Sequence, residues 1–307
     1  MNTLIAMENR AQICRVTCGW KLPHLPLEAV LRYWRDVHSP SIARRPGIWE
    51  YRHFQLEPLN PLLLDALAGI ETACPAQAQP MWISDVRYHD DDALAAFSAS
   101  PSPAVRASML ADIDLIVDQS TTYRVIGDNG HTFADRTLPS PPQGPPPAPT
   151  FAIFFRRRSD EPRFRSFLNA LCERWTNGHA VHRLRMSLFE TPDMAAEQAS
   201  GYPVKTHPVD RQYQAWFDLT LASGASLAGL FADIPGLAEH CEAIHAFPVR
   251  AVYTSNHGGK PTLVGLRGYP AFEALVGIAG YNQADPDLLE WMYGEVARGV
   301  RLEPVAS

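Results

Sequence analysis

The stretch "LPSPPQGPPPAPT", residues 138–150, divides the chain into two halves of similar length. Seven of its residues are proline, so it can form neither a helix nor a central strand. We interpret it as an extended linker, which at about 3.1 Å per residue spans on the order of 30–40 Å. That reach is enough to cross one face of a small domain and to start a second unit.

The same order of elements is predicted on both sides of this linker. Hydrophobic alternation and helical periodicity indicate strands at 12–22, 48–57, 80–90 and 120–129, with helices at 26–38 and 91–117. The second half repeats this order, with strands at 150–158, 179–190, 213–223 and 247–256, and helices at 161–177 and 225–246. The two halves align when "IWEYRHFQLE" (48–57) is placed on "VHRLRMSLFE" (181–190). Each half therefore reads β-α-β-β-α-β, the ferredoxin-like unit.

A four-stranded sheet with both helices on one side leaves its other face bare, and a second sheet can cover that face. We therefore predict an α+β fold in which two tandem ferredoxin-like units form a pseudo-dimeric α/β barrel, with a cavity between the sheets. The expected boundaries are 10–137 for the first unit, 138–150 for the linker, 151–262 for the second unit and 263–303 for a C-terminal helical extension.

Composition limits the function. The 307 residues are 46% hydrophobic and 20% charged, with a net charge of −6, which indicates a globular protein and argues against general nucleic-acid binding. No uninterrupted apolar run is long enough for a membrane span, and the N-terminus lacks a signal-peptide pattern. Five scattered cysteines suggest reduced thiols, so we expect a cytoplasmic protein. Whether two copies of the pseudo-dimeric chain associate into a homodimer stays open.

The stretch "YWRDVHSPSIARRPGIWEY", residues 33–51, resembles the signature of EthD-type proteins, a branch of the dimeric α/β barrel superfamily. The matching residues are Trp34, His38, Pro40, Pro46, Gly47 and Tyr51. The match is good over 26–57 and loose over the rest of 10–130, and only the strand and helix pattern survives in the second half. The resemblance implies one intact and one degenerate copy. It also implies a small enzyme, in most cases without an organic cofactor, although some members of the superfamily bind haem.

His38 is the first candidate for catalysis, as general base or acid, because imidazole titrates near neutral pH. The alternative is a histidine that caps a helix or is solvated. We expect the helix to end close by, because Pro40 disfavours helix at Ser39. Asp36 lies two residues earlier and points about 200° away around a helix, so we expect the partner of His38 to come from the strand at 48–57.

On that strand Tyr51 and His53 share one face with Trp49. We expect this face to line the cavity, with His53 as a further catalytic residue and Tyr51 bonding a substrate carbonyl or enolate oxygen. Together with Trp34, Trp82 and Tyr88, Trp49 is a candidate for binding a flat, hydrophobic substrate. The alternative is that these aromatic side chains belong to the core.

These patterns favour a cofactor-independent lyase, isomerase or cyclase that acts on a hydrophobic carbonyl compound or a polyphenol, such as a polyketide or an aromatic catabolite. We expect no metal site and no organic cofactor. Two alternatives stay open at this point. One is a cofactor-free or haem-dependent oxygenase on the same fold, and the other is a non-catalytic protein that binds a small molecule.

Overall fold

Each half of the chain forms a four-stranded antiparallel sheet. The computed structural model describes residues 3–64, 67–137, 140–192 and 206–302. The first sheet has the order β4-β1-β3-β2 and the second has the order β10-β7-β9-β8. Their strands are β1 (Ile13–Lys21), β2 (Ile48–Leu56), β3 (Trp82–Tyr88), β4 (Val117–Ile126), β7 (Thr150–Arg157), β8 (Val181–Leu188), β9 (Ala215–Leu221) and β10 (Cys241–His257). Both orders are ferredoxin-like, so the predicted fold class is confirmed.

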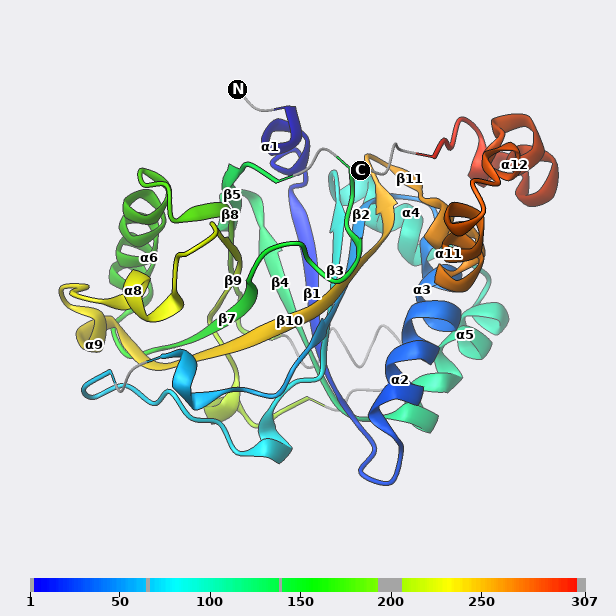
Figure 1. Cartoon of the computed structure of the whole chain (residues 1–307). Coiled ribbons are helices and arrows are strands. Elements are labelled where there is room, and N and C mark those ends of the chain that lie inside the picture. Colours follow the sequence, from blue (N-terminus) through cyan, green and yellow to red (C-terminus); the bar gives the residue numbers. More distant parts are fainter. Residues whose placement is uncertain (1–2, 65–66, 138–139, 193–205, 303–307) are drawn as a thin grey trace.

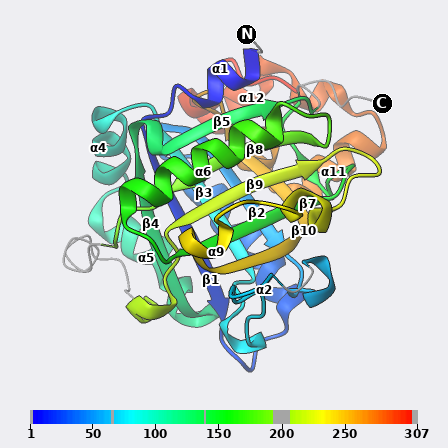
Figure 2. The same cartoon turned by 90° about the vertical axis from the view of Figure 1, so that its left-hand side faces the viewer.

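The two sheets are joined along both edges. The long strand β10 pairs first with β7 and then with β2. The end of the first half does the same in two pieces, because β4 pairs with β1 and β5 (Gly130–Asp135) pairs with β8. A short 3-10 turn, η4 (Gly127–Asn129), separates these two pieces. The sheets therefore close into a barrel with pseudo-twofold symmetry (Figures 1 and 2).

Helices cover the outer face of each sheet (Figure 1). The first sheet carries α2 (Leu27–Tyr33), the π-helical turn η1 (Trp34–His38), α3 (Ser39–Ala43), α4 (Asp91–Ala99) and α5 (Pro103–Ile116). The second sheet carries α6 (Glu161–Thr176), α8 (Leu227–Phe231) and α9 (Leu237–His240). The C-terminal helices α10 (Leu263–Arg267), α11 (Tyr269–Gly277) and α12 (Pro286–Tyr293) lie on the side of α3. The other elements of the described residues are short: α1 (Thr3–Glu8), η2 (Pro61–Leu63), η3 (Ala76–Ala78), β6 (Gln143–Gly144), η5 (Val209–Arg211), β11 (Lys260–Pro261), η6 (Tyr281–Ala284) and η7 (Gly294–Ala297).

Two expected helix boundaries are wrong. The first helix does not end near Pro40 but continues to Ala43. In the π turn the backbone N–H of Ser39 donates to the carbonyl of Trp34, five residues back, and this wider turn accommodates a proline, which has no N–H to donate. The segment at 225–246 is helical only at 227–231 and 237–240. From Cys241 onwards it is strand, because these residues form the first part of β10.

The alternation of β2 is also the reverse of our expectation. Glu50, Arg52 and Phe54 face the barrel interior, whereas Tyr51 and His53 face the helices. Phe54 belongs to an interior cluster that both halves supply, while Tyr51 packs in a cluster with helix residues of the first unit. Charged side chains are acceptable inside the barrel because there they pair with one another.

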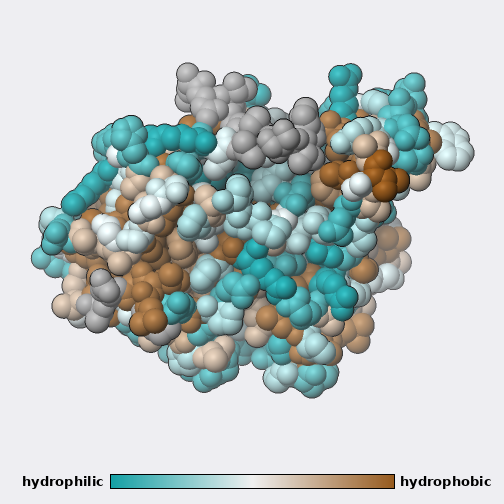
Figure 3. All heavy atoms as spheres, in the orientation of Figure 1, coloured by the Kyte–Doolittle hydropathy of each residue, from teal (hydrophilic) through white to brown (hydrophobic). Residues whose placement is uncertain are grey.

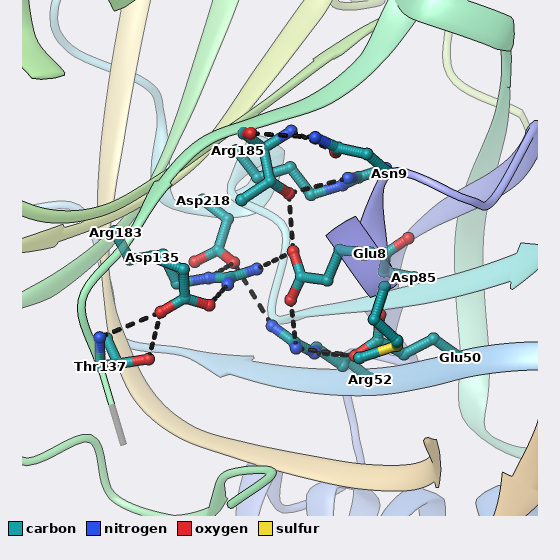
Figure 4. Close-up of polar contacts among 12 residues, drawn as sticks. Glu8, Asn9, Glu50, Arg52, Asp85, Asp135, Thr137, Arg183, Arg185 and Asp218 are labelled. Atoms are coloured by element: carbon teal, nitrogen blue, oxygen red, sulfur yellow. Dashed lines mark hydrogen bonds and ion pairs between the residues drawn. The ribbon is translucent and has the colours of Figure 1, made fainter. Parts of the chain in front are cut away.

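At one end of the barrel an ion network links the two halves (Figure 4). Arg183 of β8 contacts Glu8 at 3.0 Å and Asp218 at 2.8 Å. Glu8 also lies 2.6 Å from Arg52 of β2, and Arg52 lies 2.7 Å from Glu50. All five side chains are buried. A carboxylate of α1 therefore ties strands of both units together.

The network preserves a trace of the repeat. Arg52 lies opposite Asp85 in the β2–β3 pair, and Arg185 lies opposite Asp218 in the β8–β9 pair. The alignment of residues 48–57 with residues 181–190, continued along the chain, matches the first pair with the second. The structure thus places an arginine and an aspartate at equivalent cross-strand positions in both units.

Among the described residues, no helix is long and apolar enough to span a bilayer.

Candidate active site

A cavity of about 90 Å³ lies between the first sheet and its helices. Its helical wall comes from the η1–α3 turn and from α5, and its floor comes from the helix-facing residues of β1 to β4. The lining includes Arg15, Thr17, Trp34, His38, Ile42, Tyr51, Ser84, Val86, Tyr88, Phe97, Ile113, Val117, Ser120, Thr122 and Thr206. Four of the seven predicted site residues, Trp34, His38, Tyr51 and Tyr88, are therefore brought together here.

The π-helical turn places His38 against Trp34. The two rings stack with centroids 4.2 Å apart and an angle of 29° between their planes. Trp34 is in turn fixed by its indole N–H, which donates to Ser84 Oγ at 3.0 Å. Only 6% of His38 is exposed. The imidazole is thus held in one position beside the cavity, as a side chain that transfers protons must be.

Asp112 of α5 is the partner of His38. Its carboxylate Oδ2 lies 2.8 Å from Nδ1 of the imidazole, and both side chains are buried. A carboxylate beside Nδ1 favours the tautomer with the proton on Nδ1, which leaves Nε2 as the acceptor. Nε2 makes no hydrogen bond to any residue that the structure describes. The Asp112 carboxylate also acts on Tyr33, because burial and this nearby charge together raise the pKa of the tyrosine.

The expectation that this partner comes from β2 is wrong, because the carboxylate that contacts the imidazole belongs to Asp112 of α5. Asp112 itself was missed. Its signal in the sequence is a carboxylate on an otherwise apolar helical stripe, three residues after Met109 and four before Ile116. Asp36, by contrast, points away from His38 and pairs with Arg35 at 2.6 Å.

Tyr51 of β2 lies at the sheet side of the cavity. Its hydroxyl is 2.9 Å from Ser39 Oγ, in the turn just after His38. One hydroxyl of this pair can donate to the other, so the tyrosine can donate its own proton to a ligand while it accepts one from Ser39. The cavity therefore has an imidazole and a phenol on neighbouring walls.

The other three predicted residues lie outside this cavity. His53 is fully buried under Trp34, and neither of its ring nitrogens has a hydrogen-bond partner among the described residues. Burial, followed by the charges of His38 and Arg35, lowers its pKa to about 3. Trp82 packs against Trp34 and over Gly19, where a Cβ would lie 2.1 Å from the indole ring. Trp49 donates its indole N–H to the carbonyl of Met7 in α1.

Among the described residues, the second half contributes one residue to this cavity. Thr206, at the end of the segment that separates β8 from β9, lines its wall. The next residue, His207, contacts the first unit: its backbone N–H donates to Thr121 Oγ1 at 3.1 Å, and its ring meets Trp20 edge-on. The sequence shows this segment only as an insertion, and the prediction missed its contact with the first unit.

The equivalent place in the second unit is apolar. The alignment of the two halves puts Leu184, Met186 and Phe217 where the first unit has Tyr51, His53 and Ser84. All three are buried in the apolar cluster between the second sheet and α6. The polar groups of Tyr51, His53 and Ser84 therefore have no counterpart at these positions.

Comparisons with known proteins add little to this picture. No protein-family model and no curated protein matches the sequence. A candidate monooxygenase from Fusobacterium nucleatum is similar in structure, with 9% identity, 82% of this chain and 97% of that chain covered, and a TM-score of 0.45. A candidate monooxygenase from Lactobacillus acidophilus is similar at 8% identity, with 80% of this chain and 97% of that chain covered and a TM-score of 0.42. An anthrone oxidase-like protein is similar at 8% identity, with 81% of this chain and 94% of that chain covered and a TM-score of 0.45. Likenesses this distant carry no conclusion about function, and the fold rests on the strand order of this chain.

Proposed function

We propose that this chain is an enzyme that moves a proton at the carbon next to a carbonyl group, with His38 as the general base and acid. The observation that carries the proposal is the buried His38–Asp112 pair on the wall of the cavity between the first sheet and its helices. The EthD-type resemblance of residues 26–57 supports it, because the matching residues His38 and Tyr51 both line that cavity.

In the first step Nε2 of His38 takes the proton from the α-carbon, and the C–H electron pair moves towards the carbonyl oxygen to give an enolate. The hydroxyl of Tyr51 donates a hydrogen bond to that oxygen, where the negative charge develops. Asp112 stabilises the imidazolium that forms. Returning the proton to another carbon completes an isomerisation. Expelling a β-substituent completes a lyase reaction, and attack of the enolate on a second carbonyl completes a cyclisation.

The size of the cavity narrows the substrate. Drug-sized ligands occupy pockets of roughly 300–1,000 Å³, and a dry cavity of about 150 Å³ accommodates benzene. At about 90 Å³ the cavity fits a compact carbonyl compound better than the polyphenol expected from the sequence. Its floor carries the hydroxyls of Thr17, Ser84 and Thr122, which suit an oxygenated substrate.

Proton exchange tests the proposal whatever the final product is. The full chain is incubated in D₂O with pyruvate, 2-oxobutyrate or butanone, and the α-proton signals are followed by ¹H NMR. We expect exchange above the buffer rate with at least one compound, and a loss of about 10²–10⁴-fold in the His38→Ala variant. The exposed His24 provides the matched control, His24→Ala, which should exchange like the parent.

Equal exchange in the parent protein and the His38→Ala variant for all three compounds would contradict the proposal. Consumption of dissolved oxygen in step with loss of the compound would also contradict it, and would instead favour an oxygenase. Circular dichroism and the melting temperature of the variant show whether a loss of exchange reflects chemistry or unfolding.

A further inference from the structure

A second and much larger hollow opens at the linker end of the barrel. This cleft has a volume of about 1270 Å³, and none of its described lining residues also lines the His38 cavity. The linker at 140–149 forms one wall and α11 forms another. The two walls approach each other at Gly144, where a Cβ would lie 3.8 Å from the hydroxyl of Tyr269. The floor is the outer part of the ion network, with Arg52, Arg183 and Asp218.

The walls of the cleft are apolar and stiff. The linker supplies a run of proline rings, which carry no N–H donors and hold a fixed backbone. The opposite wall supplies Phe272 and Val276 of α11, with Leu263 of α10 beside them. Hydrophobic side chains also gather over α11 on the surface (Figure 3). Such walls suit the apolar body of a ligand, because they leave few polar groups that need partners.

The charges in the cleft are not balanced. Five lysine and arginine side chains line it against three carboxylates. Two of these carboxylates, Asp135 and Asp218, already pair with Arg183, and the third, Glu273, accepts from the Tyr269 hydroxyl at 3.5 Å. Arg52 and Arg183 belong to the ion network with Glu8 and Glu50, so the positive charge that is left in the lining comes from Arg136, Lys260 and Arg301.

Two of the cations, Lys260 and Arg301, come from segments that contact each other. Nζ of Lys260 donates to the carbonyl of Gly299 at 3.3 Å, which brings it within two residues of Arg301. Within the described part of the chain neither Lys260 nor Arg301 has a carboxylate partner. By contrast, the guanidinium of Arg136 is occupied by three backbone carbonyls. An anionic group would therefore be drawn to Lys260 and Arg301.

From this arrangement we infer that the cleft binds an amphipathic carboxylate, a molecule with an apolar body and one carboxylate group. The body lies between the linker prolines and α11, and the carboxylate pairs with Lys260 and Arg301. This binding site is independent of the proton transfer proposed for His38. The ligand itself is too large for the smaller cavity.

Decanoate titrated into the full chain, followed by isothermal titration calorimetry, tests the inference. We expect one saturable site per chain, and at least tenfold weaker binding of decanol, which has the same body without the charge. The double variant Lys260→Gln/Arg301→Gln should weaken decanoate binding at least tenfold, because it removes both charge-assisted contacts. Arg163→Gln is the matched control, since Arg163 is an exposed cation on α6, and it should bind like the parent.

His38→Ala should bind decanoate with unchanged affinity, which separates this site from the smaller cavity. The inference is overturned if decanoate shows no saturable binding, if decanol binds equally well, or if the double variant binds like Arg163→Gln. If His38→Ala bound decanoate more weakly than the double variant does, the ligand would be assigned to the His38 cavity, and this result would also overturn the inference. Failure of the proton-exchange assay alone leaves these outcomes unaffected.

Discussion

Asp112 holds the imidazole of His38 by a 2.8 Å contact to Nδ1, although 74 residues separate the two in sequence. The contact joins α5 to the π-helical turn and buries both groups. It sets which nitrogen of His38 carries the proton in the neutral ring, and it leaves Nε2 for a substrate. Asp112 thereby positions the base and stabilises its protonated form without itself contacting the substrate.

Replacing Asp112 by Asn should lower the rate constant for α-proton exchange by about 10²-fold or more, because an amide no longer stabilises the imidazolium. We expect kcat to fall and KM to change little. The ¹⁵N chemical shifts of His38 should show a changed mixture of the two neutral tautomers, which a purely structural role would not produce. The exposed Asp118 gives the control Asp118→Asn. Exchange kinetics equal to those of the parent would remove Asp112 from the mechanism.

Replacing Tyr51 by Phe removes one hydroxyl and keeps the ring. If Tyr51 donates to the enolate oxygen, kcat for exchange should fall by about 10²-fold. The partner Ser39 Oγ loses a buried hydrogen bond, so the free energy of unfolding should drop by only about 1 kcal/mol. A urea titration separates the two effects. A large loss of stability with unchanged kcat would show that the hydroxyl is structural.

The barrel could be predicted from the sequence because its information is local and repeated. Strand alternation, helical periodicity and the proline-rich divider each mark their own segment, and the alignment of the two halves matches Arg52 and Asp85 with Arg185 and Asp218. Two β-α-β-β-α-β units in one chain then have few ways to cover their bare faces.

The site could be predicted only in part, because its missing members depend on tertiary contacts. The motif identified His38 and Tyr51, but Asp112 and Thr206 reach the site from other segments. The face of β2 was assigned wrongly because neither face of this strand is cleanly apolar in the sequence. The partners in their network include Glu8 and Arg183, which lie far away in sequence. Polarity alone could not show that these charges meet inside the barrel.

Glu8 should contribute strongly to stability. Burial alone would raise the pKa of its carboxyl, but four arginines, with Arg183 and Arg52 foremost, hold the pKa well below its ordinary value. Replacing Glu8 by Gln leaves buried guanidinium groups without this counter-charge, which should cost about 3–5 kcal/mol in the free energy of unfolding. Urea denaturation measures this loss. The exposed Glu295 provides the control Glu295→Gln, with an expected change within about 0.5 kcal/mol.

The same network should make the fold sensitive to acid. The pKa of Glu50 is lowered to about 2, since Arg52 and Arg87 outweigh the effect of its burial. A carboxyl whose pKa is lower in the folded state stabilises the fold above its unfolded pKa of about 4.3, and this stabilisation is lost as the pH falls towards the folded value. The free energy of unfolding should therefore fall steeply between pH 4 and pH 2. A flat profile over this range would contradict the ion pairing in the barrel.

His53 should impose a separate loss of stability at milder pH. Its pKa of about 3 in the folded state lies below the unfolded value of about 6.5, because burial disfavours the charged ring. As the pH falls below 6.5 the unfolded chain takes up a proton that the folded chain does not, so the fold loses stability down to about pH 3. At pH 5 this loss amounts to about 2 kcal/mol.

Methionine is the replacement for His53 that the protein itself suggests, because Met186 occupies the equivalent position in the second unit. His53→Met should reduce the difference in unfolding free energy between pH 7.5 and pH 5 by about 2 kcal/mol, as measured by urea titrations at the two pH values. The control His24→Gln alters an exposed ring and should keep the difference of the parent. If the two variants show the same difference, His53 takes up its proton in the folded chain as readily as in the unfolded one, and its burial without a hydrogen-bond partner is wrong.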